Sequence, residues 1–184
     1  FRKYRLSEEQ ILHLCKNSGG ILGCKPSNFV GLFDYLRHNY DVKASELVTL
    51  FDSMPEMALQ NRQSIIHKKF DLIKRTNPNL TQIYLRNLFK RHPDLFMKSY
   101  GSMEAKVNYF KRNLNRQLQK EKAFPLLLHY NFTTHIWPRC EVLRDFGMKN
   151  FDLVEALSTT EEEFCKKFEI QPSALAHKKA KKAY

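Results

Sequence analysis

Four segments of this 184-residue chain follow one pattern, and this pattern constrains the fold more than any other feature. Pro55, Pro93 and Pro125 head three copies, and a fainter copy begins at Gly19. The starts lie 36, 38 and 32 residues apart. Apolar residues recur two, three and seventeen residues after each start. These positions hold Ile21, Leu22 and Leu36; Met57, Ala58 and Leu72; Leu95, Phe96 and Phe110; and Leu127, Leu128 and Val142.

A repeat of this length is typical of α-solenoids, in which each repeat buries its apolar face only against its neighbours. We therefore expect an all-α protein, a right-handed-type superhelical stack of about four helical repeats. The cleanest helix is expected at 102–119, where apolar residues recur at steps of three and four. Capping boxes at 7–10 and 159–162 predict two helix starts. The spacing of Trp137 and Phe146 indicates core packing rather than a base-stacking platform.

The last repeat carries the most specific residues. It reads FPLLLHYN from Phe124, IWPRCEVLRDFG from Ile136 and STTEEEF from Ser158. These segments resemble the closing signature of the mitochondrial transcription termination factor family. The chain departs from the family pattern at Asn131, where serine is usual, and at Gly19, where proline is usual.

The resemblance implies repeats of two helices and a short 3₁₀ turn. It is clearest over 46–168, and we expect one domain over 1–176 followed by a basic tail at 177–184. It also implies a mitochondrial location, with the chloroplast as the alternative. Members of the family include duplex DNA binders, rRNA-bound factors, and proteins of organellar ribosomes or of their assembly.

The chain is strongly basic, with a formal net charge of +12. Such an excess favours nucleic acid or an anionic membrane surface as partner, although a solubilising surface is the simpler reading. No apolar run approaches the length of a membrane span, so a membrane is not expected. Stacked repeats bring equivalent helix faces into one surface, so we predict that basic faces on successive helices contact phosphates. The predicted nucleic-acid-binding residues are Lys68, Arg75, Arg86, Lys90, Lys106, Arg112, Arg116, Lys120, Arg139, Lys178, Lys179, Lys181 and Lys182.

The sequence offers little to a catalytic or metal-binding interpretation. Four cysteines, Cys15, Cys24, Cys140 and Cys165, are scattered, without a CxxC pair or zinc-ligand spacing. His129 and His135 read as cap or surface residues. Gly-rich phosphate loops and hydrolase motifs are not found. We therefore expect no catalytic residue, no metal, no cofactor and no disulfide, and a protein that is not an enzyme.

Three functions fit these observations. A stack of about four repeats offers a short groove, which suits docking on structured RNA among the proteins of a larger ribonucleoprotein. The first hypothesis is therefore an rRNA-bound component of the mitochondrial ribosome or a ribosome-associated factor. The second is a double-stranded DNA-binding transcription termination factor. The third is a protein–protein adaptor whose groove takes a helix.

Overall fold

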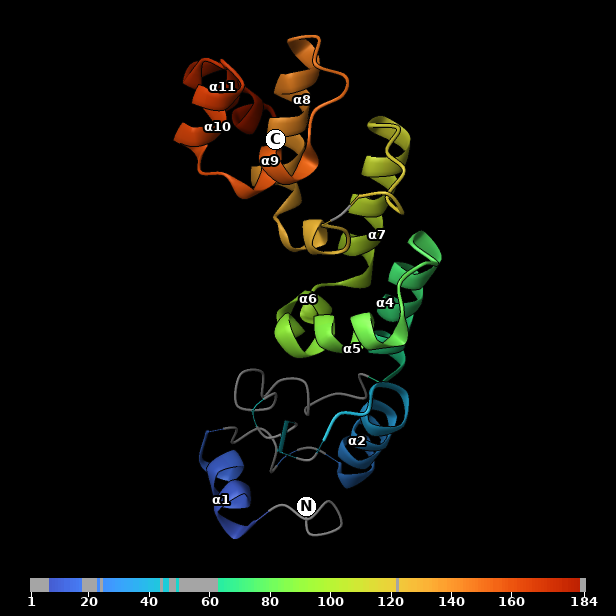
Figure 1. The fold of residues 1–184 in the computed structure, drawn as a ribbon. Coiled ribbons are helices and arrows are strands. Elements are labelled where there is room, and N and C mark those ends of the chain that lie inside the picture. The colour runs from blue at the N-terminus through green and yellow to red at the C-terminus, as the bar shows by residue number, and fades with distance from the viewer. Residues whose placement is uncertain are drawn as a thin grey trace. The chain divides into compact units, whose positions relative to one another are not determined.

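The computed structural model describes residues 7–17, 23, 25–43, 45, 46, 49, 63–121 and 123–182. These residues form helices and turns, and none of them lies in a strand. The expected all-α fold class is therefore confirmed for the described part of the chain. The chain divides into two compact units, unit 1 at residues 1–100 and unit 2 at residues 101–184 (Figure 1).

Unit 1 is a set of helices around an aromatic core. Its described helices are α1 (Glu8–Asn17), α2 (Pro26–Tyr40), α4 (Gln63–Thr76), α5 (Gln82–Arg91) and α6 (Pro93–Met97). Helix α2 packs against α4 and α5, and α5 packs against α6. The ring of Phe70 lies 4.0 Å from that of Tyr40 and 4.4 Å from that of Phe96, measured between centroids. This cluster joins three helices, because its rings come from α2, α4 and α6.

Local sequence signals explain where these helices begin. Ser7 and Gln10 exchange two hydrogen bonds, of 3.0 and 3.2 Å, which confirms the first predicted capping box. Pro26 occupies the first turn of α2, where its missing N–H costs nothing. The Thr81 hydroxyl caps α5 by accepting from the Tyr84 N–H at 3.1 Å.

Unit 2 contains all of α7 (Tyr100–Asn108) except its first residue, and it also contains the last repeat. The π-helical turn η4 (Tyr109–Asn113) extends α7. The 3₁₀ turn η5 (Leu126–His129) follows Pro125, and the π-helical turn η6 (Phe132–Ile136) leads into α8 (Trp137–Asp145). Helix α8 packs against α9 (Leu153–Ser158), α11 (Pro172–Lys182) and η6, while α10 (Glu161–Lys167) packs against α11.

The repeat positions are buried wherever the structure describes them. The apolar pairs after Pro93 and Pro125 are at most 1% exposed, and the positions seventeen residues after each start are at most 5% exposed. These residues are Leu36, Leu72, Leu95, Phe96, Phe110, Leu127, Leu128 and Val142. Gly19, Ile21, Leu22, Pro55, Met57 and Ala58 lie outside the described residues. The pattern therefore marks positions that face the core, as the repeat interpretation requires.

Buried lysines fasten one repeat to the next in both units. The Lys69 ammonium donates to the Phe96 carbonyl, and the Lys106 ammonium donates to the Leu128 carbonyl at 2.7 Å. Phe96 and Leu128 occupy the same position, three residues after their prolines. Each lysine thus reaches the short helical turn that follows the proline of the next repeat. Helix ends of this kind carry partial negative charge, which a cation stabilises.

Arg139 plays the same part at the end of the last repeat. Its Nη1 donates to the carbonyls of Ala156, at 2.9 Å, and Thr159, at 2.8 Å, at the C-terminal end of α9. Its guanidinium also lies over the Phe164 ring, 4.8 Å from the centroid. Burial lowers the pKa of Arg139, and the neighbouring carboxylate of Glu161 opposes that shift. Such a side chain ties α8 to α9 and α10.

Two predicted boundaries differ from the structure. The helix expected at 102–119 ends at Asn113, because Asn115 adopts a left-handed φ of 49° that an α-helix cannot contain. The Arg116 N–H instead closes the helix end by donating to the Phe110 carbonyl at 2.9 Å. The second capping box lies at Thr160 and Glu163, one residue later than predicted. Thr159 does not cap α10, since its hydroxyl donates to the Glu155 carbonyl at 2.9 Å.

Candidate nucleic-acid interface

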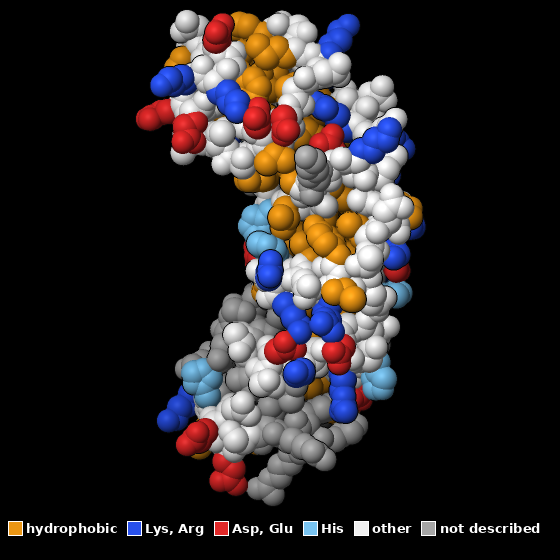
Figure 2. Space-filling view, in the orientation of Figure 1, with side chains coloured by type: hydrophobic (Ala, Val, Ile, Leu, Met, Phe, Trp, Pro, Cys, Tyr) orange, Lys and Arg blue, Asp and Glu red, His pale blue; other side chains and the backbone are white. Residues whose placement is uncertain are grey.

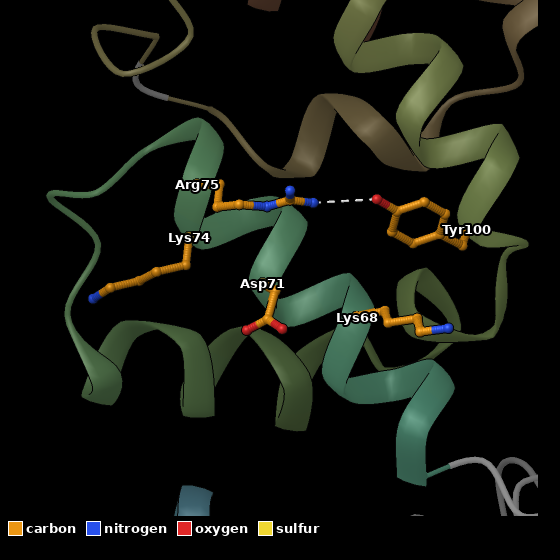
Figure 3. Close-up of a pocket in the computed structure, with 5 residues that line it drawn as sticks. All are labelled: Lys68, Asp71, Lys74, Arg75 and Tyr100. Carbon is orange, nitrogen blue, oxygen red and sulfur yellow. Dashed lines mark hydrogen bonds between the residues drawn. The ribbon is translucent and has the colours of Figure 1, made fainter.

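The first basic groove lies on α4 in unit 1. Lys68, Asp71, Lys74, Arg75 and Tyr100 line an open depression of about 630 Å³, which we call the α4 groove. Figure 3 shows Lys68 and Arg75 extending from α4 toward the side on which Tyr100 lies, whereas Lys74 extends to the other side. Arg75 Nη2 donates to the Tyr100 hydroxyl at 3.2 Å. The sequence prediction that Lys68 and Arg75 share one side of a helix agrees with this arrangement.

The amphipathic pattern of α4 places these charges in solvent. Ile66, Phe70 and Ile73 are at most 2% exposed and anchor the helix. Lys68, Asp71, Lys74 and Arg75 lie on the opposite side and are exposed. Asp71 lies 3.1 Å from His67 Nε2, which gives the single carboxylate of the groove a local partner. Figure 2 shows Lys and Arg side chains gathered over the region of α4 and α5, with acidic side chains among them.

Arg86 and Lys90 of α5 form ion pairs with carboxylates of the protein. Arg86 Nη1 lies 2.7 Å from Asp41 Oδ2, and the Lys90 ammonium binds the Glu46 carboxylate. Burial raises the pKa of Glu46, but the hydrogen bonds from Lys90 and from the Lys43 N–H outweigh it and leave this pKa below its usual value. Both cations therefore fasten α5 to the segment after α2, and phosphate would have to displace a carboxylate to reach them.

The second basic groove lies in unit 2 beyond the end of η4. It is an open depression of about 710 Å³ between the turn at 113–121 and the segment at 144–151, and we call it the loop groove. Its cations are Arg116, Lys120, Arg144 and Lys149, and its one carboxylate is Glu121. Four amide side chains also line it: Asn113, Asn115, Gln117 and Asn150.

The predicted row of Arg112, Arg116 and Lys120 is broken. Arg112 stays on η4 with an exposed side chain, but Arg116 and Lys120 lie beyond the helix end, so a helical spacing no longer aligns the three. Arg116 turns inward, donates to the Phe151 carbonyl and lies over the Phe151 ring, 4.9 Å from the centroid. Arg116 is thus a support of the loop groove, and Lys120 is one of its exposed charges.

Lys106 and Arg139 were predicted to bind nucleic acid, but both side chains are buried. Each is 2% exposed, and each is bonded to backbone carbonyls inside unit 2. A phosphate cannot reach either cation without opening the core. Helical spacing held a signal for this burial, because Lys106 follows buried Met103 by three residues and Arg139 follows buried Ile136 by three.

The basic residues of the predicted tail lie in a helix as far as Lys182. His177 to Lys182 are the C-terminal half of α11, which packs against α8. Lys178 lies 2.5 Å from Asp145, and Lys179 binds Glu161. Lys181 is exposed, and Lys182 belongs to the same helix. Of these predicted contacts, Lys178 and Lys179 are engaged within unit 2.

Several groove residues were missing from the sequence prediction. Tyr100 lies 25 residues from Arg75 in the chain, and Lys149 lies in a segment without periodicity. Phe146 was expected to pack in the core, yet its ring is 51% exposed at the end of α8. The one available signal was the Asn113-Leu114-Asn115 sequence, which favours a helix end and so a turn.

Side chains of the types that bind metal ions are not clustered in the described part of the chain. No group of three or more His, Cys, Asp or Glu side chains comes together among the described residues. Cys140 and Cys165 are buried thiols, and burial raises the pKa of Cys140 to about 12. Cys24 lies outside the described residues. Within the described part, no helix is both long and apolar enough to cross a membrane.

Comparison with known families agrees with this arrangement of repeats. The family model described as mTERF matches residues 1–165 of the 184. The chain belongs to the mTERF family. Membership implies a nucleic-acid-binding helical-repeat protein of a family whose members are typically organellar. No curated protein matches the chain.

Proposed function

We propose that this mTERF protein binds structured RNA, as an rRNA-bound component of the mitochondrial ribosome or a ribosome-associated factor. It acts by binding and not by catalysis. The proposal combines the family membership, the net charge of +12 and the two basic grooves. A plastid location is the alternative, because the family is typically organellar.

The observation that carries the proposal is a set of exposed cations whose charge is not matched. Within the described part of the chain, Lys68, Arg112, Lys120 and Lys149 have exposed side chains and no ion-pair partner. Other cations, such as Arg86 and Lys178, are paired with carboxylates. Phosphates are the natural partners of the unmatched set, because neutralising them releases condensed counterions.

The form of the grooves favours RNA over duplex DNA. Three of the exposed cations line open depressions: Lys68 in the α4 groove, and Lys120 and Lys149 in the loop groove. A regular duplex backbone would be matched best by a continuous row of cations along a helix, and the predicted row of Arg112, Arg116 and Lys120 is broken. Tyr100 and the amides of the loop groove add groups that both donate and accept hydrogen bonds. RNA offers complementary groups in its 2′-hydroxyls and in the base edges of its loops.

Binding of a fluorescent RNA hairpin over a range of salt concentrations tests the proposal. If about four phosphates are neutralised, log K falls against log salt with a slope of roughly −3 to −4. The variants Lys68→Gln/Arg75→Gln and Lys120→Gln/Lys149→Gln each flatten the slope by up to about 2. Lys43→Gln/Lys166→Gln removes the same charge from exposed sites outside both grooves and is the matched control.

Two results contradict the proposal. Duplex DNA binding of one sequence, hundreds-fold above random DNA and RNA, identifies a transcription factor instead. Salt-independent binding to a protein, with no nucleic acid retained, identifies an adaptor.

A further inference from the structure

We infer that the loop groove binds unpaired RNA nucleotides by hydrogen bonds to their base edges and riboses. This inference rests on the proposed function and adds to it a second kind of contact beside the phosphate contacts. The α4 groove holds charges and one tyrosine, whereas the loop groove combines charges with four amides. Charge alone attracts any polyanion, but amides distinguish one hydrogen-bonding ligand from another.

The amides of the loop groove are available for a ligand. Asn113, Asn115, Gln117 and Asn150 are exposed, and within the described part none has a side-chain hydrogen-bond partner. Each amide offers two donor hydrogens and one acceptor oxygen. Paired bases already use their Watson–Crick edges for one another, so unpaired nucleotides present more donors and acceptors than a duplex does. The 2′-hydroxyl, which both donates and accepts, adds a further group that DNA lacks.

The cations of the groove divide into two sets. Arg144 donates to Glu141 at 2.8 Å, and Arg116 lies 3.8 Å from Glu121, so both have carboxylates nearby. Lys120 and Lys149 are exposed and, among the described residues, have no ion pair. Two free ammonium groups beside amides suit a ligand in which phosphates alternate with hydrogen-bonding groups. An acidic peptide would satisfy the lysines but would offer no base edges to the amides.

The walls of the groove are held in place before a ligand arrives. Arg116 joins the turn at 113–121 to the segment at 144–151 through the Phe151 carbonyl and the Phe151 ring. Asn115 fixes the turn in a left-handed conformation, with φ at 49°. Preorganised walls lower the entropy lost when a ligand is bound.

An exposed aromatic ring lies in the same segment of the chain. Phe146 stands between the lining residues Arg144 and Lys149 in sequence, and half of its surface is open to solvent. Unstacked bases gain free energy by stacking on such rings. Phe146 is therefore the residue on which we expect a base to stack.

Binding of the full chain to three probes tests the inference. The probes are an eight-nucleotide unpaired RNA of mixed sequence, the DNA of the same sequence, and a blunt RNA duplex. The variant Asn113→Ala/Gln117→Ala/Asn150→Ala should weaken binding to the unpaired RNA about tenfold, and duplex binding and the salt slope should be unchanged, because amides carry no charge. Asn108→Ala/Gln171→Ala, which removes exposed amides elsewhere in unit 2, should match the wild type.

The ribose and the ring are tested separately. Wild type should prefer the RNA to the DNA, and the triple variant should reduce that preference toward one. Phe146→Ala should weaken binding to the unpaired RNA about tenfold. Phe146→Tyr should bind it like the wild type, because an aromatic face is retained.

The failure of the inference is distinct from that of the proposed function. If the triple variant binds unpaired RNA like the wild type, while Lys68→Gln/Arg75→Gln still weakens the hairpin, the inference is overturned and the proposed function stands. Equal loss on unpaired and duplex RNA also overturns it, because the amides would then act only through the fold. If the wild type binds none of the RNA probes, the proposed function itself fails.

Discussion

The α4 groove and the loop groove are both basic, but the two units build them differently. Lys68 and Arg75 stand on one helix, and their positions need only the buried side of α4 to stay packed. The loop groove is assembled from the turn at 113–121 and the segment at 144–151, joined by Arg116 and Phe151. Charge on a helix face follows from the helix alone, whereas charge in a loop groove depends on contacts between segments.

The cations of both units divide into those that are buried and bonded within the protein and those that are exposed to solvent. Unit 1 contains both kinds side by side, since Lys69 is buried on the Phe96 carbonyl and Lys68 is exposed in the α4 groove. In unit 2, Lys106 and Arg139 are buried while Lys120 and Lys149 are exposed. The net charge of +12 therefore overstates the charge available to a nucleic acid.

The largest effect is expected from removing a buried cation. Lys69→Met or Arg139→Met should lower the free energy of unfolding by about 3 kcal/mol, because buried carbonyls lose charged donors. Lys68→Met, at the next residue, should change it by less than about 0.5 kcal/mol, because that side chain is exposed. Urea unfolding measures both. Equal costs for Lys68 and Lys69 would remove the distinction between the two kinds of cation.

A smaller effect should distinguish the two grooves. Arg116→Gln should lower the free energy of unfolding by about 1–2 kcal/mol, because it removes the bond to the Phe151 carbonyl and the contact with the ring. Arg75→Gln, in the α4 groove, should cost less than about 0.5 kcal/mol, since its bond to Tyr100 is exposed. Thermal unfolding of the two variants makes the comparison. If Arg75→Gln proved the more costly, the loop groove would not depend on its supporting arginine.

The turn of the loop groove should respond to its backbone conformation. Asn115→Ala should lower the free energy of unfolding by about 1 kcal/mol, because alanine is strained at a φ of 49°, whereas Asn115→Gly should cost little. Chemical denaturation tests the pair. An alanine variant as stable as the glycine variant would mean that the helix continues past Asn113.

The smallest effect concerns pH and belongs to unit 2. Burial lowers the pKa of His135, and the charge of Arg139 acts in the same direction, although the bond to the Leu157 carbonyl opposes them. The unfolded chain therefore binds a proton more readily, so stability is full above the unfolded pKa of about 6.5 and declines as the pH falls below it. His135→Gln should flatten that decline. A variant with an unchanged pH profile would exclude His135 as its source.

What the sequence could predict depends on whether a residue's position follows from helical spacing or from contacts between distant segments. The proline repeat predicted the buried positions Leu95, Phe96, Leu127 and Leu128, since burial at fixed spacing leaves a pattern in the sequence. The prediction that Lys68 and Arg75 share one side of a helix followed from helical geometry. Periodicity places Lys106 and Arg139 on the apolar sides of their helices, but it could not show the carbonyls that bond them, because those residues are distant in sequence.

The loop groove was not predicted, because one conformation at Asn115 ends a helix that periodicity extends to residue 119. With the helix ended, Arg116 and Lys120 leave the helical face and meet Lys149 and Asn150. Phe146 was mispredicted for the same reason. Apolar spacing places it on the core side of a helix, but α8 ends at Asp145 and the ring is exposed.

Lysine footprinting tests the central claim most directly. The full chain is treated with an amine-reactive reagent, with and without a structured RNA hairpin, and the modification of each lysine is measured by mass spectrometry. We expect RNA to protect Lys68, Lys120 and Lys149, and to leave Lys43 and Lys166 as reactive as before. Lys69 and Lys106 should stay unreactive in both samples because they are buried. Uniform protection of all exposed lysines, or protection confined to Lys43 and Lys166, would contradict the account.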